Sequence, residues 1–250
     1  TTYTTTLNPA TGAEIPRATN TSELVKGSYG AGWNASGAFG YKLSENIALE
    51  LGLTYSAGKE YLTHARYTDT RLDVLKSLSN ETETSKSRAI LFTPALRFMT
   101  HKRNFTPYFS IGPVLGKINF RRSLGRTTEE DGTTTTEYRN TKFTGGISLG
   151  LRGSVGVSVV INRKLSLFSE ITFTGMNYYP KESEITSYII NGEDKLSTLT
   201  ANVRKTVYAK NITRDSNSAS DDVKVPNKSL RFPVGMSSLS LNAGVLIDLR

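Results

Sequence analysis

The fold is decided by residues 143–179, which read FTGGISLGLRGSVGVSVVI (143–161), NRK (162–164) and LSLFSEITFTGMNYY (165–179). In both long runs apolar residues occupy alternate positions, and this period of two is typical of strands with one apolar face. The pair predicts an antiparallel hairpin whose turn is NRK. Each run is longer than the roughly 9–11 residues that a tilted strand needs to cross a bilayer.

The composition of the chain neither requires nor excludes a membrane. The chain has 250 residues, of which 37% are hydrophobic, and its mean hydropathy is −0.33. It contains no apolar run near the roughly 18 residues of a helical span, but a barrel of strands would be compatible with these values because only alternate residues face lipid. The absence of cysteine excludes disulfide bridges, thiolate metal sites and cysteine nucleophiles.

The formal net charge of +9 raises nucleic acid as a partner. The positive residues are scattered, however, with only small clusters such as Arg121-Arg122 and Arg163-Lys164, and no basic helix. We therefore expect no nucleic-acid partner, and we expect the clusters to lie in solvent or near anionic lipid headgroups.

The alternation recurs in five further segments, and together with the opening pair they predict seven strands of an all-β protein. The further segments are residues 29–43, 47–57, 88–99, 106–121 and 236–250.

Two features depart from simple alternation. Between residues 106 and 121 the apolar positions change parity near Gly116 to favour Ile118 and Phe120, which predicts a β-bulge. Prolines also fall inside two of the segments and count against them as central strands, because proline lacks the N–H that a ladder needs. These prolines are Pro94, Pro107 and Pro113.

The connections between the seven strands alternate between short and long. The short ones are residues 44–46, 100–105 and 162–164, and the long ones are about 58–87, 122–141 and 180–235. Outer-membrane barrels sort their connections in this way into periplasmic turns and extracellular loops, whereas a soluble sandwich, the alternative fold, has no reason to. Within the last loop, residues 187–190 and 203–208 could extend neighbouring strands.

Three elements carry a resemblance to a known family: GAFGYKLSENIALELGLTYSAG (37–58), TPYFSIGPVLG (106–116) and LSLNAGVLIDLR (239–250). They resemble strands of eight-stranded bacterial outer-membrane β-barrels, the group of outer-membrane protein A and the opacity-type, porin-like barrels. The resemblance covers about residues 28–250 without the loops. It implies an antiparallel up-and-down transmembrane barrel, one domain over residues 1–250, located in the bacterial cell outer membrane. Arg250 departs from the aromatic residue that often ends such barrels.

The strand count predicts an eighth strand. Single-chain bacterial barrels have an even number of strands, and an open edge in lipid would leave backbone groups unpaired. The strand at 29–43 descends toward the periplasm, so an ascending strand must precede it. Residues 1–27 are expected to be an extracellular loop or the upper end of that strand. We therefore expect the first strand to be largely missing from this chain, or supplied by another chain, and we expect no continuous ladder between 29–43 and 236–250.

The polar face of the strands is expected to line the lumen, because an arginine facing lipid at the midplane costs roughly 2–4 kcal/mol. Four charged residues lie on it: Glu50, Arg97, Arg152 and Glu170. Burying a charge without a partner is heavily penalised, so we expect these residues to form a lumenal ion network. A static polar plug is the favoured interpretation, and a gate for ions or small solutes is the alternative.

Aromatic residues are expected to form a girdle at the two membrane interfaces, since most of them lie toward strand ends. Stacking surfaces for sugar or nucleic acid are the less favoured interpretation. The girdle residues are Trp33, Phe39, Tyr41, Tyr55, Phe98, Phe109, Tyr178 and Tyr179.

Catalysis finds little support in the residue types. A barrel enzyme that modifies lipid needs a histidine beside a serine and a carboxylate at the outer rim. His101 falls in an expected periplasmic turn, and His64 has Ser56, Glu60 and Asp69 near it in sequence without a spacing that joins them. We expect no enzyme activity, no metal site and no cofactor.

These observations predict a non-enzymatic outer-membrane β-barrel with a plugged polar lumen and long surface loops. The expected partners are the lipid bilayer, lipopolysaccharide and an outer-membrane protein bound by the loops, with the chain as a subunit of a larger complex. A narrow porin-like channel gated by the lumenal Glu/Arg pairs is the first alternative. A lipid-modifying barrel enzyme is the second.

Overall fold

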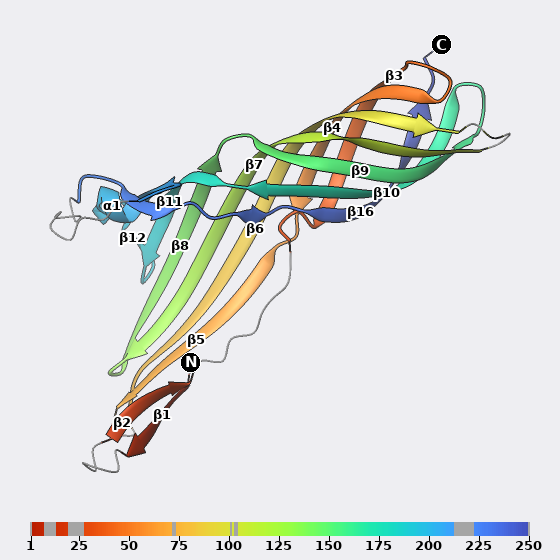
Figure 1. Cartoon of the computed structure of the whole chain (residues 1–250). Coiled ribbons are helices and arrows are strands. Elements are labelled where there is room, and N and C mark those ends of the chain that lie inside the picture. The colour runs from red at the N-terminus through yellow and green to blue at the C-terminus, as the bar shows by residue number, and fades with distance from the viewer. Residues whose placement is uncertain are drawn as a thin grey trace.

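The computed structural model describes residues 2–7, 14–19, 28–71, 74–100, 102, 105–212 and 223–249. The fold is all-β, as predicted, with one mostly antiparallel sheet of 14 strands and a separate two-stranded sheet. Figure 1 shows three parts, a curved wall, a long arm that continues from it, and a smaller lobe beside the base of the arm. No helix in the described ranges is long and apolar enough to cross a membrane.

The wall contains the seven predicted strands, which lie side by side in the order β3-β4-β6-β7-β9-β10-β16 and are antiparallel to their neighbours. Three connections between them are short, as predicted. Its strands are β3 (Gly32–Lys42), β4 (Ile47–Gly58), the C-terminal half of β6 (Val74–Met99), the N-terminal half of β7 (Phe105–Glu130), β9 (Ser148–Val160), β10 (Leu165–Tyr178) and β16 (Ser238–Ile247).

The wall is an open sheet, because its first and last strands do not form a ladder with each other. We call the space between β3 and β16 the seam. The Tyr29 amide donates to the Gly235 carbonyl at 3.0 Å at one end of the seam, and Lys42 Nζ lies 4.0 Å from Asp248 Oδ2 at the other. Both strands run in the same direction, so an antiparallel meander cannot close across the seam.

The inward side of β3 is exposed at Ser36, Ala38 and Gly40, whereas inward residues of the opposite strands, such as Ser154 and Thr172, are buried. The absence of a continuous β3–β16 ladder agrees with the prediction.

The predicted extracellular loops are wrong in large part, because they are mostly strands. β6 and β7 each have 26 residues and continue beyond the wall, and with their neighbours they form the arm, in the order β5-β6-β7-β8-β11. Threonine-rich segments pair readily as strands when both faces can be solvated. The other strands of the arm are β5 (Tyr61–Arg71), β8 (Thr133–Gly145) and β11 (Pro180–Ile190).

The tip of the arm is a tight hairpin between β7 and β8. Asp131 and Gly132 have positive φ values of 46° and 78°, which is the conformation of a type I′ turn and explains the Asp-Gly pair there. The low-complexity threonines 133–136, which had suggested a loop, belong to the second strand of this hairpin.

The lobe follows β11 and lies near the base of the arm (Figure 1). Of the two segments predicted to extend neighbouring strands, residues 187–190 lie in β11, which follows β10 after one residue and pairs with β8. Residues 203–208 lie instead in α1 and β13, and β13 pairs with β11. The short β15 (Val234–Gly235) pairs with the end of β10. The remaining elements are β12 (Glu193–Asp194), the 3₁₀ helix Leu196–Thr198, α1 (Ala201–Arg204), β13 (Lys205–Ala209) and β14 (Asn227–Leu230).

The first part of the chain contains β1 (Thr2–Leu7) and β2 (Glu14–Thr19), which pair with each other beside β5. Residues 1–27 had been expected to be a loop or the upper end of a wall strand. In the described part β1 pairs with β2 alone, so it does not extend the wall.

The opening stretch 143–161 is two strands rather than one. β8 ends at Gly145 and β9 begins at Ser148, and the break lets Phe143 belong to the arm while Leu149 belongs to the wall. Phe143 is buried on the inward face beside Phe120, whereas Leu149 is 71% exposed on the outward face.

The predicted bulge near Gly116 is wrong. The β6–β7 ladder keeps one register through Ala89↔Ile118 and Phe92↔Leu115. Ile118 and Phe120 face inward like Tyr108, so the parity of the strand never changes. The hydrophobicity changes face instead, because the outward side stops being apolar at Lys117 while the inward side becomes apolar.

The prolines do not exclude central strands. Pro94 of β6 lies at the level of Pro113 of β7, and the ladder between the two strands is interrupted from Phe92↔Leu115 to Leu96↔Ile111. Each proline still has a partner on its other side, at Leu51↔Pro94 and Pro113↔Leu151. Placing both prolines at one level confines the lost hydrogen bonds to a single interruption.

Candidate functional site

The interior of the wall contains a charged cluster made by the four residues that the sequence singles out. Strand alternation turns Glu50, Arg97, Arg152 and Glu170 inward from β4, β6, β9 and β10. Arg97 Nη2 lies 2.9 Å from Glu50 Oε1, and Arg152 Nη2 lies 3.5 Å from Glu170 Oε1. The cluster therefore holds two cations and two anions and is neutral as a whole.

Glu170 is the centre of this cluster, with only 8% of its surface exposed. The Tyr108 hydroxyl donates to its Oε2 at 2.9 Å, and the Thr172 hydroxyl donates to Oε1 at 3.1 Å. Asn242 Nδ2 also donates to Oε1, at 3.4 Å. These donors lie on β7, β10 and β16, and Arg152 lies on β9. The Glu170 carboxylate therefore links four neighbouring or facing strands of the wall.

The two arginines extend the cluster to the rest of the wall. Arg152 Nη1 donates to the Thr54 hydroxyl of β4 at 3.2 Å, and the Arg97 guanidinium lies 4.1 Å from the centre of the Tyr108 ring. Cation–π contact of this kind is favourable where water is excluded. The result is one polar network that reaches six of the seven wall strands, with β3 beside the seam outside it.

Sequence reasoning missed Tyr108 and Asn242 as members of the network. Tyr108 lies over Gly156 of β9, its register partner, where an added Cβ would be 2.6 Å from the ring. Glycine opposite an inward aromatic residue is a local signal for such a contact, and it could have placed the ring. Nothing in the sequence signals that Asn242 meets Glu170, because the two strands are far apart in the chain.

An apolar layer closes the interior between the polar network and the arm. Val114 and Tyr178 are fully buried in it, and Met176 and Leu91 pack over Gly116, with their side chains about 3 Å from where its Cβ would be. The layer comprises Ala89, Leu91, Val114, Ile118, Phe120, Phe143, Met176, Tyr178, Val234 and Met236. Among the described residues, this apolar layer lies between the polar network and the charged residues of the arm.

Tyr178 was predicted to belong to the interfacial girdle, and this is wrong. It faces inward at the end of β10 and is 0% exposed, against Gly145, whose added Cβ would be 2.6 Å from the Tyr178 ring. Its parity agrees with Glu170 and Thr172, so alternation within β10 already excludes the outward side. The neighbouring Tyr179 is 47% exposed.

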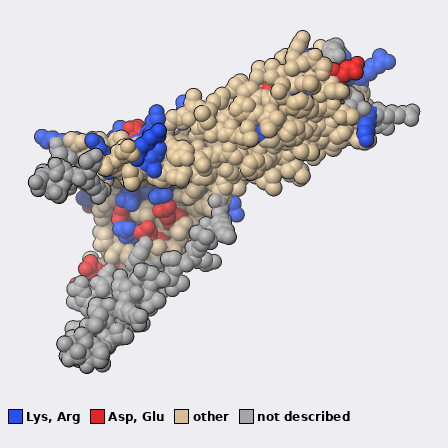
Figure 2. Space-filling view, viewed as in Figure 1, with Lys and Arg blue, Asp and Glu red and all other residues tan. Residues whose placement is uncertain are grey.

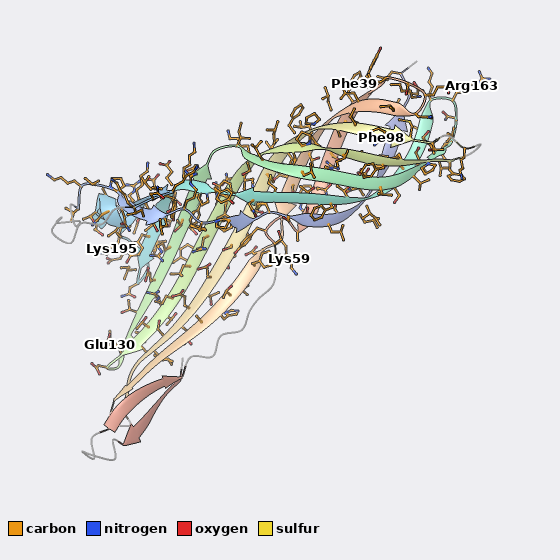
Figure 3. The ribbon with its side chains drawn as sticks, in the orientation of Figure 1. Phe39, Lys59, Phe98, Glu130, Arg163 and Lys195 are labelled. Carbon is orange, nitrogen blue, oxygen red and sulfur yellow. The ribbon has the colours of Figure 1, made fainter. Side chains whose placement is uncertain are left out.

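The other predicted girdle residues are exposed on the outward face, at both ends of the wall. Trp33 and Tyr55 form a pair beside the arm, with ring centres 5.5 Å apart. Phe39, Tyr41, Phe98 and Phe109 lie toward the turns at the opposite end. In Figure 3 the labelled Phe39 and Phe98 lie at that end of the wall.

The inward face of the arm carries a second set of charges, in segments for which the sequence predicts loops. Arg126 of β7 is paired with Glu81 of β6 at 2.6 Å and lies 3.6 Å from Glu137 of β8. Arg122 lies 3.0 Å from Glu83 and over the Phe143 ring. Figure 2 shows charged residues gathered in the hollow between the arm and the lobe, in contrast to the nearly uncharged wall.

Between the lobe and β11, Glu182 and Lys205 form an exposed pair at 2.8 Å. A hydrogen bond from Lys205 holds the pKa of the Glu182 carboxyl below its usual value, and the same bond raises the pKa of Lys205.

Among the described side chains, the hydrogen-bond partner of His64 is a threonine and not a serine or a carboxylate. Its Nδ1 lies 3.2 Å from the Thr82 hydroxyl on the next strand, while Glu60 pairs with Lys86 at 2.6 Å. Ser56 lies on β4, and His101 and the Asp69 side chain lie outside the described residues. Within the part of the chain that is described, no three histidine or acidic side chains gather in a way that could hold a metal ion.

Comparison with known proteins gives no relative. No protein-family model, curated protein or solved structure matches this chain.

Proposed function

We propose that this chain is a non-enzymatic transmembrane β-barrel of a bacterial outer membrane, which anchors an extracellular β-sheet arm for binding a partner. The observation that carries the proposal is the outward face of the wall. From Trp33 on β3 to Ile247 on β16, its outward positions are apolar or small, and most large side chains there are 38–77% exposed. An apolar surface of this extent needs a non-aqueous environment.

The height of the apolar surface supports a bilayer as that environment. The outward positions on β4 run from Leu49 to Ala57, and those on β9 from Leu149 to Val159. Strands of this length, tilted by about 40°, span the roughly 25 Å apolar band of outer-membrane barrels. Expected contacts are the lipid bilayer and lipopolysaccharide.

The change of polarity between wall and arm supports a boundary with water. On β6 the outward residues change from Phe92 and Ile90 to Arg88 and Lys86, and on β7 they change from Leu115 to Lys117. Ile90 pairs with Lys117, so the change on the two strands falls within one two-residue step of the ladder. Interior residues become apolar at the same height, as expected where the outside turns from lipid to water.

Closure of the wall is part of the proposal. Because β3 and β16 run in the same direction, one ascending strand between them would pair antiparallel with both and would give eight strands, an even number. It would satisfy the unpaired main-chain groups of both edges, which cost several kcal/mol each in lipid. This strand would also cover the exposed inward face of β3.

The test is heat-modifiable migration combined with membrane insertion. Folded protein in detergent micelles should migrate differently on a gel before and after boiling, and it should resist alkaline extraction from lipid vesicles. A protein that folds in buffer without detergent and leaves vesicles at high pH would be a soluble sheet, and the proposal would fail.

Closure has its own test, because the chain contains no cysteine. Cysteines placed at Gly40 and Leu246 should not form a disulfide if a strand separates the two edges, since two strand spacings are about 10 Å. A disulfide formed at high yield would mean that β3 and β16 pair directly in parallel.

A further inference from the structure

The outward face of the arm contains a shallow pocket of about 320 Å³. It lies on β6, β7 and β8, above a notch left by Gly125, where an added Cβ would meet nothing within 4 Å. Thr82 and Tyr138 are the direct register partners of Gly125 on its two sides. Side chains of one row point to the same face, so these two residues form the walls of the notch.

The same row continues across the sheet. His64 of β5 is the register partner of Thr82 and contacts its hydroxyl, and Ile189 of β11 is the partner of Tyr138. Tyr138 is 44% exposed, so the ring is accessible beside the notch. Adjacent strands are about 4.8 Å apart, and a missing side chain between Thr82 and Tyr138 therefore leaves a gap about two strand spacings wide.

The neighbouring row is polar and uncharged. Asn80, Thr127 and Thr136 are register partners on β6, β7 and β8 and also line the pocket. The backbone amide and the hydroxyl of Thr136 both donate to the side-chain oxygen of Asn191. Arg126 and Glu137, which also line the pocket, lie at positions that alternate with this row. On the inward face Arg126 forms ion pairs with Glu81 and with Glu137.

We infer that this pocket binds a neutral carbohydrate, with one sugar ring in the Gly125 notch against Tyr138. Sugars present an apolar C–H face and a rim of hydroxyl groups. An exposed aromatic ring packs against the C–H face. Neutral hydroxyl and amide groups can both donate hydrogen bonds to the sugar hydroxyls and accept them. An acidic or phosphorylated ligand would require a cation, and the arginine nearest the notch is engaged on the other face.

This inference names a ligand class for the arm and rests on the proposed function in so far as the arm must be outside the cell. The pocket itself is independent of membrane insertion. Detergent-refolded protein can therefore be tested for binding whether or not it passes the insertion test, and the two failures can be told apart.

The experiment is binding to an array of oligosaccharides that includes maltoheptaose, xylohexaose and, as acidic probes, oligogalacturonate and heparin fragments. At least one neutral oligosaccharide should bind. Tyr138→Ala should weaken that binding roughly tenfold, or about 1.4 kcal/mol, because the ring no longer packs against the sugar. Gly125→Leu should abolish it by filling the notch, and the open space there allows this variant to fold.

The matched control is Tyr188→Ala, which removes the same kind of ring from the opposite face of the arm, one position from Ile189. It should leave binding unchanged, and all variants should keep heat-modifiable migration. The inference is overturned if no neutral oligosaccharide binds at millimolar concentration, if acidic probes are preferred, or if binding survives both Tyr138→Ala and Gly125→Leu.

Discussion

The wall and the arm share two strands, β6 and β7, but the outward and inward side chains of those strands differ in polarity between the two parts. In the wall the outward face is apolar and the inward face holds the ion network. In the arm the outward face carries threonines and Tyr138, and the inward face combines ion pairs with buried apolar residues such as Leu124. The register of the two strands is the same in the wall and in the arm. The backbone therefore does not account for the difference, and the proposed function attributes it to lipid around the wall and water around the arm.

The largest effect is expected from a charge on the outward face of the wall. Phe92→Arg should cost roughly 4–7 kcal/mol, the sum of arginine insertion in lipid and lost phenylalanine burial. Thr84→Arg lies on the same face of the same strand, but in the arm, and should be nearly neutral. Urea titration of the heat-modifiable band in lipid vesicles measures both. Equal effects of the two variants would contradict a membrane boundary between them.

The next effect concerns buried and exposed ion pairs. Glu170→Ala should destabilise the protein by about 3–5 kcal/mol, because Arg152 would be left buried without its partner. Glu184→Ala breaks an exposed pair with Arg204 of 3.0 Å and should cost less than about 1 kcal/mol.

The double variant Arg152→Leu, Glu170→Leu is the control for this prediction. It should recover part of the loss in the same titration, since no unpaired charge remains. If the double variant is less stable than Glu170→Ala, the contacts of the network stabilise the folded protein by themselves, beyond avoiding an unpaired buried charge.

A third prediction compares the polar network with the apolar layer above it. The wild-type protein in planar bilayers should give no stepwise conductance, since Val114 and Tyr178 fill the interior. Arg97→Ala should remain silent, because the apolar layer still blocks the path. Wild-type conductance that Glu50→Ala or Arg97→Ala abolishes would instead support a gated channel.

The smallest effect is the pH response of Glu182 and Lys205 at the lobe. The pKa of Glu182 is lowered in the folded state, so its contribution is present above its unfolded pKa and is lost as pH falls through the folded value. Lys205 behaves in the opposite sense, because its folded pKa is raised. Its contribution is present below its unfolded pKa and is lost as pH rises through the folded value.

Glu182→Gln should therefore lower the Tm by at most about 1 °C at pH 7. The difference should disappear at an acid pH below the lowered pKa of Glu182, where the wild-type carboxyl is also protonated. Thermal melts of the two proteins at both pH values provide the measurement. A difference that grows in acid would reverse the expected sign.

Alternation alone was enough to predict the seven wall strands, their short turns and the inward side of Glu50, Arg97, Arg152 and Glu170. A period of two is a local property, and a buried or lipid-covered face imposes it on every strand. The same rule failed where its premise failed. In the arm the outward face is polar and no apolar periodicity marks the strands, so the pattern predicts loops where the structure has strands.

The sequence by itself determined an all-β chain, the apolar outward face of the wall and the charges that face its interior, because these follow from residue order within single strands. Only the tertiary structure decided which charges meet, that an apolar layer closes the interior, that Tyr178 lies inside it, and that β3 and β16 face each other across an open seam. These facts depend on register between strands distant in the chain. Register is set by the sum of many pairings, and no single stretch encodes it.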